Sequence, residues 1–403
     1  MAIVIGVPRS ADPSETRTPI VGDVVKKLKA LGADIVVERG ATAAAHVTED
    51  ALGEVRWVDS TAEVIDAADV VWTIGNLTPD AEARLRPGQV VMGLLAPYSS
   101  RDHAASLATQ GVTAFSLELL PRISRAQSMD ILSSQGSVSG YQCVLIAASR
   151  APKFFPMLTY AAGSIRPSRV LIIGVGVAGL QAIATAKRLG AIVEAYDVRP
   201  ETREQVESLG AKFVDTGVSA AGTGGYAREL TEEEKAKQAE KLAKAVGNAD
   251  ILITTAAIPG KKSPVIITRA MVEAMRPGAI VVDMAAEGGG NVDGTVAGQE
   301  VMIGDALVIG PVNLPSRMPV HASEMFSKNL FNFTAPMIVD GNLAIDFGDD
   351  VIAGTALTHA GAIAHPMVAK VLGFAPDETA APQPSAPQAA PEASAPEHQE
   401  NQA

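Results

Sequence analysis

Residues Arg169 to Asp197 read RVLIIGVGVAGLQAIATAKRLGAIVEAYD and form one strand–turn–helix–strand pattern. The apolar, β-branched run from Arg169 to Ile173 is typical of a buried parallel strand. Gly174, Gly176 and Gly179 follow it in the spacing G-x-G-x-x-G. In this setting the first glycine allows the tight turn, the second lets the backbone approach a pyrophosphate, and the third lets helix and strand pack closely. The stretch therefore predicts a dinucleotide site with phosphate at the helix N-terminus.

The end of the second strand indicates which dinucleotide binds. Asp197 follows AIVEAY, where a carboxylate accepts hydrogen bonds from two ribose hydroxyls and repels a 2′-phosphate. Arg199 is open to two interpretations, because an arginine here accommodates a 2′-phosphate or is only a solvated surface charge. The carboxylate at the strand terminus outweighs it, so the predicted cofactor is NAD(H). The predicted cofactor-binding set also includes Val175, Val177, Val198, Arg199 and Gly260.

Composition and charge narrow the class of protein. The chain has 403 residues, is 47% hydrophobic and carries a net charge of −12. It is long enough for two or three domains, and without a basic cluster it is not expected to bind nucleic acid. Its single cysteine, Cys143, fits a reducing cytosol and a place in the core. No leader and no run of eighteen apolar residues are present, so we expect a soluble chain with no membrane span.

Short apolar runs alternate with helical stretches along both halves of the chain. In the first half the expected strands are AIVIGV, DIVVE, DVVWTIG, QVVMGLL and TAFSLE, and a helix is expected near Thr18 to Leu31. In the second half they are RVLII, AIVEAY, AKFV, DILITTA, AIVVDM and ALVIG. The pattern predicts an α/β fold with two doubly wound, Rossmann-like parallel-sheet domains and a cleft between them. Because ligands bind at the carboxyl ends of such strands, the loops after Gly174, Asp197, Ala256 and Met284 should converge on the cofactor.

The predicted domain limits follow from composition and pattern. The first domain spans residues 1–135 and is completed by residues 318–374, because the apolar pattern from His321 to Phe331 needs a partner surface. Residues 136–317 form the nucleotide-binding domain. Residues 375–403 are rich in proline, alanine and acid, and we expect a disordered tail.

A long connection between Val214 and Asp250 interrupts the second half. Its first part is glycine-rich and contains Tyr226, and its second part is typical of a helix with Thr231 as N-cap. Such a loop is either a mobile lid over the cofactor or a solvated insertion.

The segment PRISRAQSMDILSSQ carries the candidate chemistry. Arg122 and Gln127 can clamp a carboxamide, Asp130 can fix the amide nitrogen of a nicotinamide ring, and Ser133 lies close behind. A purely structural polar helix start is an equally open interpretation. The six histidines show no metal-ligand spacing and no G-x-S-x-G nucleophile elbow occurs, so no metal and no covalent catalysis are predicted.

Together, the glycine fingerprint, PRISRAQSMDILSSQ and the pair MAAEGGGN and SRMPVHASEMFSKNL resemble the NAD(H)-binding component, domain I, of proton-translocating nicotinamide nucleotide transhydrogenase. The resemblance covers about Met1 to Phe374. It implies that Arg122, Gln127 and Asp130 hold the dihydronicotinamide, that the three glycines and Asp197 hold adenosine and pyrophosphate, and that Tyr226 lies on the mobile loop.

The same resemblance implies hydride transfer between NADH and NADP⁺, coupled to proton movement. The partners would be an NADP(H)-binding domain and a membrane-spanning component, with this chain a homodimer, cytoplasmic and peripheral to the inner membrane. Since the chain has one fingerprint, the second nucleotide must come from a partner. Direct hydride transfer needs no acid, base or metal. Bringing the two nicotinamide rings together supplies most of the reduction in the reaction barrier.

Two alternatives remain open. Alanine dehydrogenase shares the fold, but that family places a lysine and a histidine in segments that read VVWTIGNLTP and VVMGLLAPYSS here, and neither contains one. His103 lies near enough to keep this alternative open. The other alternative is a nucleotide-sensing or scaffold subunit, against which the intact Arg122, Gln127 and Asp130 set speaks.

Overall fold

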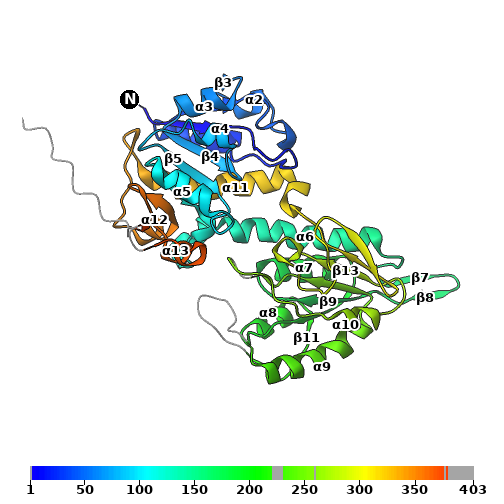
Figure 1. Ribbon diagram of the computed structural model, residues 1–403. Helices are drawn as coiled ribbons and strands as arrows, with labels where there is room; N and C mark the ends of the chain where they lie inside the picture. The colour runs from blue at the N-terminus through cyan, green and yellow to red at the C-terminus, as the bar shows by residue number, and fades with distance from the viewer. Residues whose placement is uncertain (1, 220–229, 258–259, 376–377, 380–403) are drawn as a thin grey trace, which may run out of the picture.

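The computed structural model describes residues 2–219, 230–257, 260–375 and 378–379. It contains two α/β units, and helix α6 (Ile131–Arg150) runs from one into the other (Figure 1). Tyr226 and nearly all of the predicted tail lie outside the described residues. At the start of that tail, Glu378 forms an ion pair of 2.9 Å with Arg101.

The first unit is built on an eight-stranded sheet with the order β19-β18-β6-β5-β4-β1-β2-β3. Six strands are parallel: β1 (Val4–Val7), β2 (Asp34–Glu38), β3 (Arg56–Val58), β4 (Val70–Ile74), β5 (Val90–Leu94) and β6 (Thr113–Ser116). From the other end of the chain come two antiparallel strands, β18 (Ala356–His359) and β19 (Ala362–Ile363). The sheet therefore joins residues more than 240 positions apart, as in the pairing of Ala114 with Thr358.

The helices of the first unit are α1 (Gly22–Ala30), α2 (Glu49–Leu52), α3 (Thr61–Ala67), α4 (Pro79–Glu82), α5 (Arg101–Thr109), α11 (Pro319–Thr334), α12 (Asp350–Thr355) and α13 (Pro366–Leu372). Short 3₁₀ turns are η1 (Ala43–Ala45), η2 (Leu117–Leu119), η3 (Ser124–Met129) and η6 (Ala335–Met337), and a small hairpin joins β16 (Ile338–Val339) to β17 (Asn342–Leu343). Helix α11 buries Phe326, Leu330 and Phe333 in the core of this unit.

The second unit has a seven-stranded sheet with the order β11-β10-β9-β12-β13-β15-β14. Its strands are β9 (Arg169–Ile173), β10 (Ile192–Tyr196), β11 (Lys212–Phe213), β12 (Ile251–Thr254), β13 (Ile280–Asp283), β14 (Glu300–Ile303) and β15 (Ala306–Ile309). Its helices are α7 (Val177–Arg188), α8 (Thr202–Ser208), α9 (Glu232–Asn248) and α10 (Arg269–Glu273), with 3₁₀ turns η4 (Ala286–Gly288) and η5 (Leu314–Arg317). A separate hairpin consists of β7 (Leu158–Tyr160) and β8 (Gly163–Ile165).

Alternation along β9 shows why this sheet is covered on both faces. Val170 and Ile172 lie in one apolar core, whereas Leu171 and Ile173 lie in the other. Successive side chains of a strand point to opposite faces, so an all-apolar strand needs cover on both. The predicted doubly wound α/β fold is therefore confirmed.

Local predictions were right where the pattern was strong and wrong where it was weak. Helix α9 begins at Glu232 with Thr231 as N-cap, in a reciprocal capping box with Glu234, as predicted. The helix expected from Thr18 starts only at Gly22. Pro19 disfavours the helical conformation at Thr18, and the Thr18 amide donates to Ser323 Oγ at 2.9 Å instead. Strands β3 and β14 and the β7–β8 hairpin were not predicted, because they are short and largely exposed.

Helices α6 and α7 approach each other at a glycine. A Cβ atom at Gly140 would lie 2.0 Å from the carbonyl oxygen of Ala178, which is in the first turn of α7. Gly140 therefore permits backbone contact between the two helices. This contact fixes the start of α7, where the glycine turn ends, against the helix that enters the first unit.

We predict that Gly140→Ala lowers the free energy of unfolding by roughly 1–3 kcal/mol, because the added methyl group must push two backbones apart. Gly136→Ala in the same helix is the matched control. A Cβ there meets no described atom within 4 Å, and alanine is the better helix former, so it should stabilise the protein by about 0.5–1 kcal/mol. Denaturant unfolding measures both, and equal stability of the two variants would contradict the contact.

Candidate functional site

The three glycines of the fingerprint serve three different geometric needs. Gly174 has a φ of +90°, the left-handed region that favours glycine. A Cβ at Gly179 would lie 1.9 Å from the Gly174 carbonyl oxygen, so only glycine lets α7 pack on the turn. A Cβ at Gly176 meets no described atom within 4 Å, so its surroundings are open. The glycines thus provide the turn, the packing and the room for a ligand that the sequence predicted.

The N-terminus of α7 is suited to an anion. Its N-cap is Gly176, which has no side chain to bond the amides of the first turn. Those amides and the positive end of the helix dipole favour a phosphate at this position. Val175 is buried, whereas Val177, the first residue of the helix, is 44% exposed.

Asp197 lies directly after β10 and beside the glycine turn. It is buried, and its Oδ2 accepts a 2.7 Å hydrogen bond from the Val175 amide. The guanidinium of Arg199 donates to both carboxylate oxygens, from Nε at 2.9 Å and from Nη2 at 2.8 Å. Arg199 is therefore paired with Asp197, with half-buried Val198 between them. Of the two interpretations of Arg199, the solvated surface charge is wrong.

A second carboxylate, which the sequence analysis overlooked, organises the loops around this turn. Asp283 ends β13 and is fully buried. One oxygen accepts from Thr254 Oγ1 at 2.8 Å and from the Ala285 amide at 3.1 Å. The other accepts from the amides of Asn291 and Val292 at 2.8 and 3.0 Å. Four donors thus form hydrogen bonds to one carboxylate. These bonds offset the free-energy cost of removing Asp283 from water.

Asn291 extends this network to the neighbouring loop. Its Oδ1 accepts from the Ala256 amide at 3.0 Å, and its Nδ2 donates to the carbonyls of Ala256 and Pro264 at 2.8 and 2.9 Å. Next to Ala256, Thr255 Oγ1 donates to the Gly174 carbonyl at 2.9 Å. The loops after β9, β12 and β13 are thus held together. The sequence signal was available, since the apolar run AIVVD ends in an acid just as AIVEAYD does.

The segment PRISRAQSMD forms a loop containing η3 and ends at the start of α6. Asp130 is the N-cap of α6 and accepts from the Ser133 amide at 2.9 Å and from Ser133 Oγ at 2.5 Å. The structure thus brings Asp130 and Ser133 together. Arg122 and Gln127 are exposed on the same loop.

Arg125 anchors this loop to α12. Its guanidinium donates to both oxygens of Asp349 at 2.7 and 2.8 Å. This bidentate hydrogen bond also holds the pKa of Asp349 below its usual range. The loop is therefore tied at Arg125 and at Asp130, and it presents Arg122 and Gln127 to the outside.

The two units meet beside these loops. Gly260 has a φ of +70°, and a Cβ there would lie 3.1 Å from the ring of Tyr98, which follows β5 of the first unit. The loops after β5 and β12 are thus in contact. Gly260, which was predicted to bind the cofactor, lies at this junction.

A buried ion pair forms a second junction. Arg17 Nη2 donates to Glu15 at 2.7 Å, and Nη1 donates to Gln135 of α6 at 2.9 Å. Ser316, in η5, donates to Glu15 at 2.5 Å. Burial opposes ionisation of Glu15, but its hydrogen bonds from Arg17 and Ser316 outweigh it and hold the pKa below its usual range. The sequence analysis did not single out these residues.

Two further observations concern metals and membranes. Over residues 2–219, 230–257, 260–375 and 378–379, no group of three or more His, Cys, Asp or Glu side chains could hold a metal ion. In the same described ranges, every helix is too short or too polar to cross a bilayer. Cys143 is buried in the core of the second unit, and burial raises the pKa of its thiol.

Both halves of the chain match known protein families. Residues 6–139 match the model described as alanine dehydrogenase/PNT, N-terminal domain, and residues 143–366 match alanine dehydrogenase/PNT, C-terminal domain. The first part of NAD(P) transhydrogenase subunit alpha from Rhodospirillum rubrum is 45% identical over 375 residues, which cover 90% of this chain and 98% of the relative. The alanine dehydrogenase of Mycobacterium tuberculosis is 24% identical, with 92% and 96% covered.

Solved structures agree with these relatives. The crystal structure of transhydrogenase from Sinorhizobium meliloti has a TM-score of 0.81 and 40% identity, and the match covers 90% of this chain and 99% of that one. An L-alanine dehydrogenase structure, at 22% identity and a TM-score of 0.78, shares the fold. The chain therefore belongs to the alanine dehydrogenase/PNT family, and it is more similar to the transhydrogenase alpha subunits named here than to the alanine dehydrogenases.

Proposed function

We propose that this chain is the NAD(H)-binding subunit of a proton-translocating transhydrogenase, which passes hydride between NADH held here and NADP⁺ held by a partner domain. The observation that carries the proposal is that the sequence has one glycine fingerprint, Gly174, Gly176 and Gly179. We call the turn that these glycines form, together with the first turn of α7, the dinucleotide cradle. Both sheets have the same order of their first five strands, but only β9 is followed by the glycine fingerprint, whereas β1 continues into VPRSAD. One cradle on a chain with 45% identity to a transhydrogenase subunit supports a reaction that needs a second chain.

The residues around the cradle fit a bound dinucleotide. The open backbone at Gly176 and the first turn of α7 would hold the pyrophosphate. Asp197 would hold the adenosine ribose, Val198 and Arg199 would line this end of the site, and Gly260 would contact the cofactor as well. NADH supplies the hydride, and the chain binds and orients it and excludes water.

The exposed loop supports the transfer step. Arg122, Gln127 and Asp130 would hold the carboxamide of the dihydronicotinamide from one side. Because Arg122 and Gln127 face outward, a second ring on a partner domain can approach the same edge. Holding the two rings close together lowers the barrier to hydride transfer without any proton transfer by the protein.

The proposal extends to assembly and location. The NADP(H)-binding domain and the membrane-spanning component would be the partners, and the chain would be cytoplasmic and attached to the inner membrane through them. The relatives are named as an alpha subunit or as the first part of one, and these names support an assembly of several polypeptides.

The structure gives a structural role to His103, the residue that keeps the alanine dehydrogenase alternative open. It rested on His103 as an acid or base. In the structure His103 Nδ1 lies 2.6 Å from Glu82 Oε2, and this mostly buried pair joins α5 to α4. This contact therefore joins two helices of the first unit, and it supports a structural role for His103.

The hairpin β7–β8 supports the homodimer. Every residue of the two strands is exposed, and Met157, Leu158, Tyr160 and Ile165 are its apolar side chains. An isolated two-stranded hairpin is marginal in water and is stabilised by packing against another surface.

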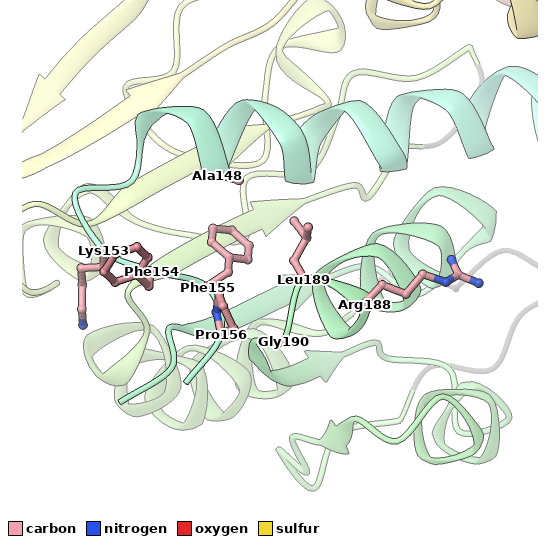
Figure 2. Close-up of a pocket in the computed structure, with 8 residues that line it drawn as sticks. All are labelled: Ala148, Lys153, Phe154, Phe155, Pro156, Arg188, Leu189 and Gly190. Carbon is pink, nitrogen blue, oxygen red and sulfur yellow. The ribbon is translucent and has the colours of Figure 1, made fainter. Parts of the chain in front are cut away.

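A shallow groove lies at the base of the hairpin (Figure 2). Its volume is about 540 Å³, and it is lined by Phe154, Phe155 and Pro156 on one side and by Leu189 and Gly190 at the end of α7 on the other. Hairpin and groove are on the same chain, so two copies can exchange them about a two-fold axis.

We predict that Gln127→Asn leaves the affinity for NADH largely unchanged but slows hydride transfer to the NADP(H)-binding domain by roughly ten- to a hundredfold, because the shortened amide misplaces the ring. Fluorescence titration with NADH and stopped-flow turnover with the partner domain measure the two effects. Equal losses in both, or none, would refute this role of Gln127.

The proposed reaction itself is tested with the wild-type chain. Titration with NADH and with NADPH should show one site that prefers NADH, and hydride transfer should require the partner domain. Reduction of NAD⁺ with alanine by the chain alone would overturn the proposal.

We predict that Leu158→Asp combined with Tyr160→Asp weakens dimerisation at least about tenfold, because two charges enter an apolar interface. Both positions are exposed in the single chain, so the fold should survive. Met367→Asp, at a position 53% exposed on α13, is the matched control and should remain dimeric. Analytical ultracentrifugation reports the result, and a monomeric wild type or a dimeric double variant would contradict this interface.

A further inference from the structure

Asp197 accepts four hydrogen bonds from residues that the structure describes, and they fall into two kinds. Two come from the backbone, from the amide of Val175 at 2.7 Å and from the amide of Arg199 at 2.9 Å. The other two come from the Arg199 guanidinium. A carboxylate offers about four acceptor positions. These four hydrogen bonds therefore occupy all the acceptor positions of Asp197.

The backbone donors cannot leave easily. Val175 is 2% exposed and belongs to the glycine turn. The backbone of Arg199 is also held on the other side of its Cα, because Thr202 Oγ1 donates to the Arg199 carbonyl at 2.7 Å. The side chain of Arg199 is different, since it is 18% exposed and is attached through a flexible stem.

We infer that Arg199 is an exchangeable cap on Asp197, and that it must release the carboxylate before the adenosine ribose of NAD(H) binds there. This inference rests on the proposed function. Two ribose hydroxyls need two acceptor positions, and the departure of the guanidinium opens two. Arg199 thereby competes with the ribose and weakens the binding of NADH.

The exchange also has a consequence for nucleotide choice. Charge-assisted hydrogen bonds from Arg199 are stronger than the bonds from neutral hydroxyls that replace them. Breaking the Arg199–Asp197 pair therefore lowers the affinity for NADH. The released guanidinium stays close to the ribose edge. Asp197 is then the group that excludes a 2′-phosphate, and Arg199 is a cation that would accept one if Asp197 lost its charge.

The first test is Arg199→Met, which keeps the length of the side chain but removes both donors. The dissociation constant for NADH should fall by roughly three- to tenfold, the range expected when a partly exposed ion pair no longer opposes binding. Arg203→Met is the matched control. Arg203 pairs with Asp215 on the same edge, so its loss removes one positive charge without uncapping Asp197.

Fluorescence titration with NADH distinguishes the outcomes. Tighter binding by Arg199→Met than by Arg203→Met supports the exchange. Equal or weaker binding overturns it, because Arg199 would then be a ligand or a bystander. If the wild-type chain binds no NADH at all, the proposed function fails, whereas normal binding that is insensitive to Arg199→Met defeats only this inference.

A second test uses NADPH and does not depend on turnover. Asp197→Asn should gain at least about tenfold in affinity for NADPH, because the repulsion is lost and the carboxylate no longer holds the Arg199 guanidinium. The double variant Asp197→Asn with Arg199→Met should lose that gain. An equal gain in both variants would show that Arg199 does not bind the 2′-phosphate and would overturn this part of the inference.

Discussion

A carboxylate without access to water, Asp283, holds the ligand-binding edge of the second sheet in one shape. Its oxygens bind the amides of the loop after β13, and Asn291 carries the connection to the loop after β12. Thr255 then reaches the carbonyl of Gly174 in the glycine turn. Three loops that belong to different strands thus depend on one buried ion. The backbone groups that would face the cofactor in the proposed site are thereby positioned by the protein itself, which is what preorganised binding requires.

Asp197 shows a different use of the same chemistry. Asp283 has only rigid donors and is wholly buried, so it is suited to structure. Asp197 has two backbone donors and one side-chain guanidinium that is 18% exposed, at the margin of the open glycine turn. Both acids end apolar strands of the same sheet, β10 and β13. In our proposal, the structural carboxylate and the ligand-binding carboxylate at this edge therefore differ in whether their hydrogen-bond partners can leave.

The sequence was sufficient for the fold because apolar runs such as RVLII can only be buried on both faces. The Thr231 cap was equally clear, since threonine three residues before glutamate can make reciprocal bonds. Long-range partners were beyond such patterns. Nothing local indicates that Asn291 bonds Ala256 or that Glu15 meets Ser316. These pairings depend on which loops the topology brings together, and periodicity carries no information about that.

Helix α6 fixes the distance between two parts of the candidate site. Its N-cap, Asp130, ends the loop that presents Gln127, and Gly140 seats the same helix on the first turn of α7. At 1.5 Å per residue, these positions are about 15 Å apart along an unbroken helix. A rocking movement of one unit against the other would bend loops but would leave this spacing unchanged. In the proposed reaction, the nicotinamide ring and the phosphates of NAD(H) would be bound at a constant separation. The nicotinamide ring on the partner domain would approach and leave without changing it.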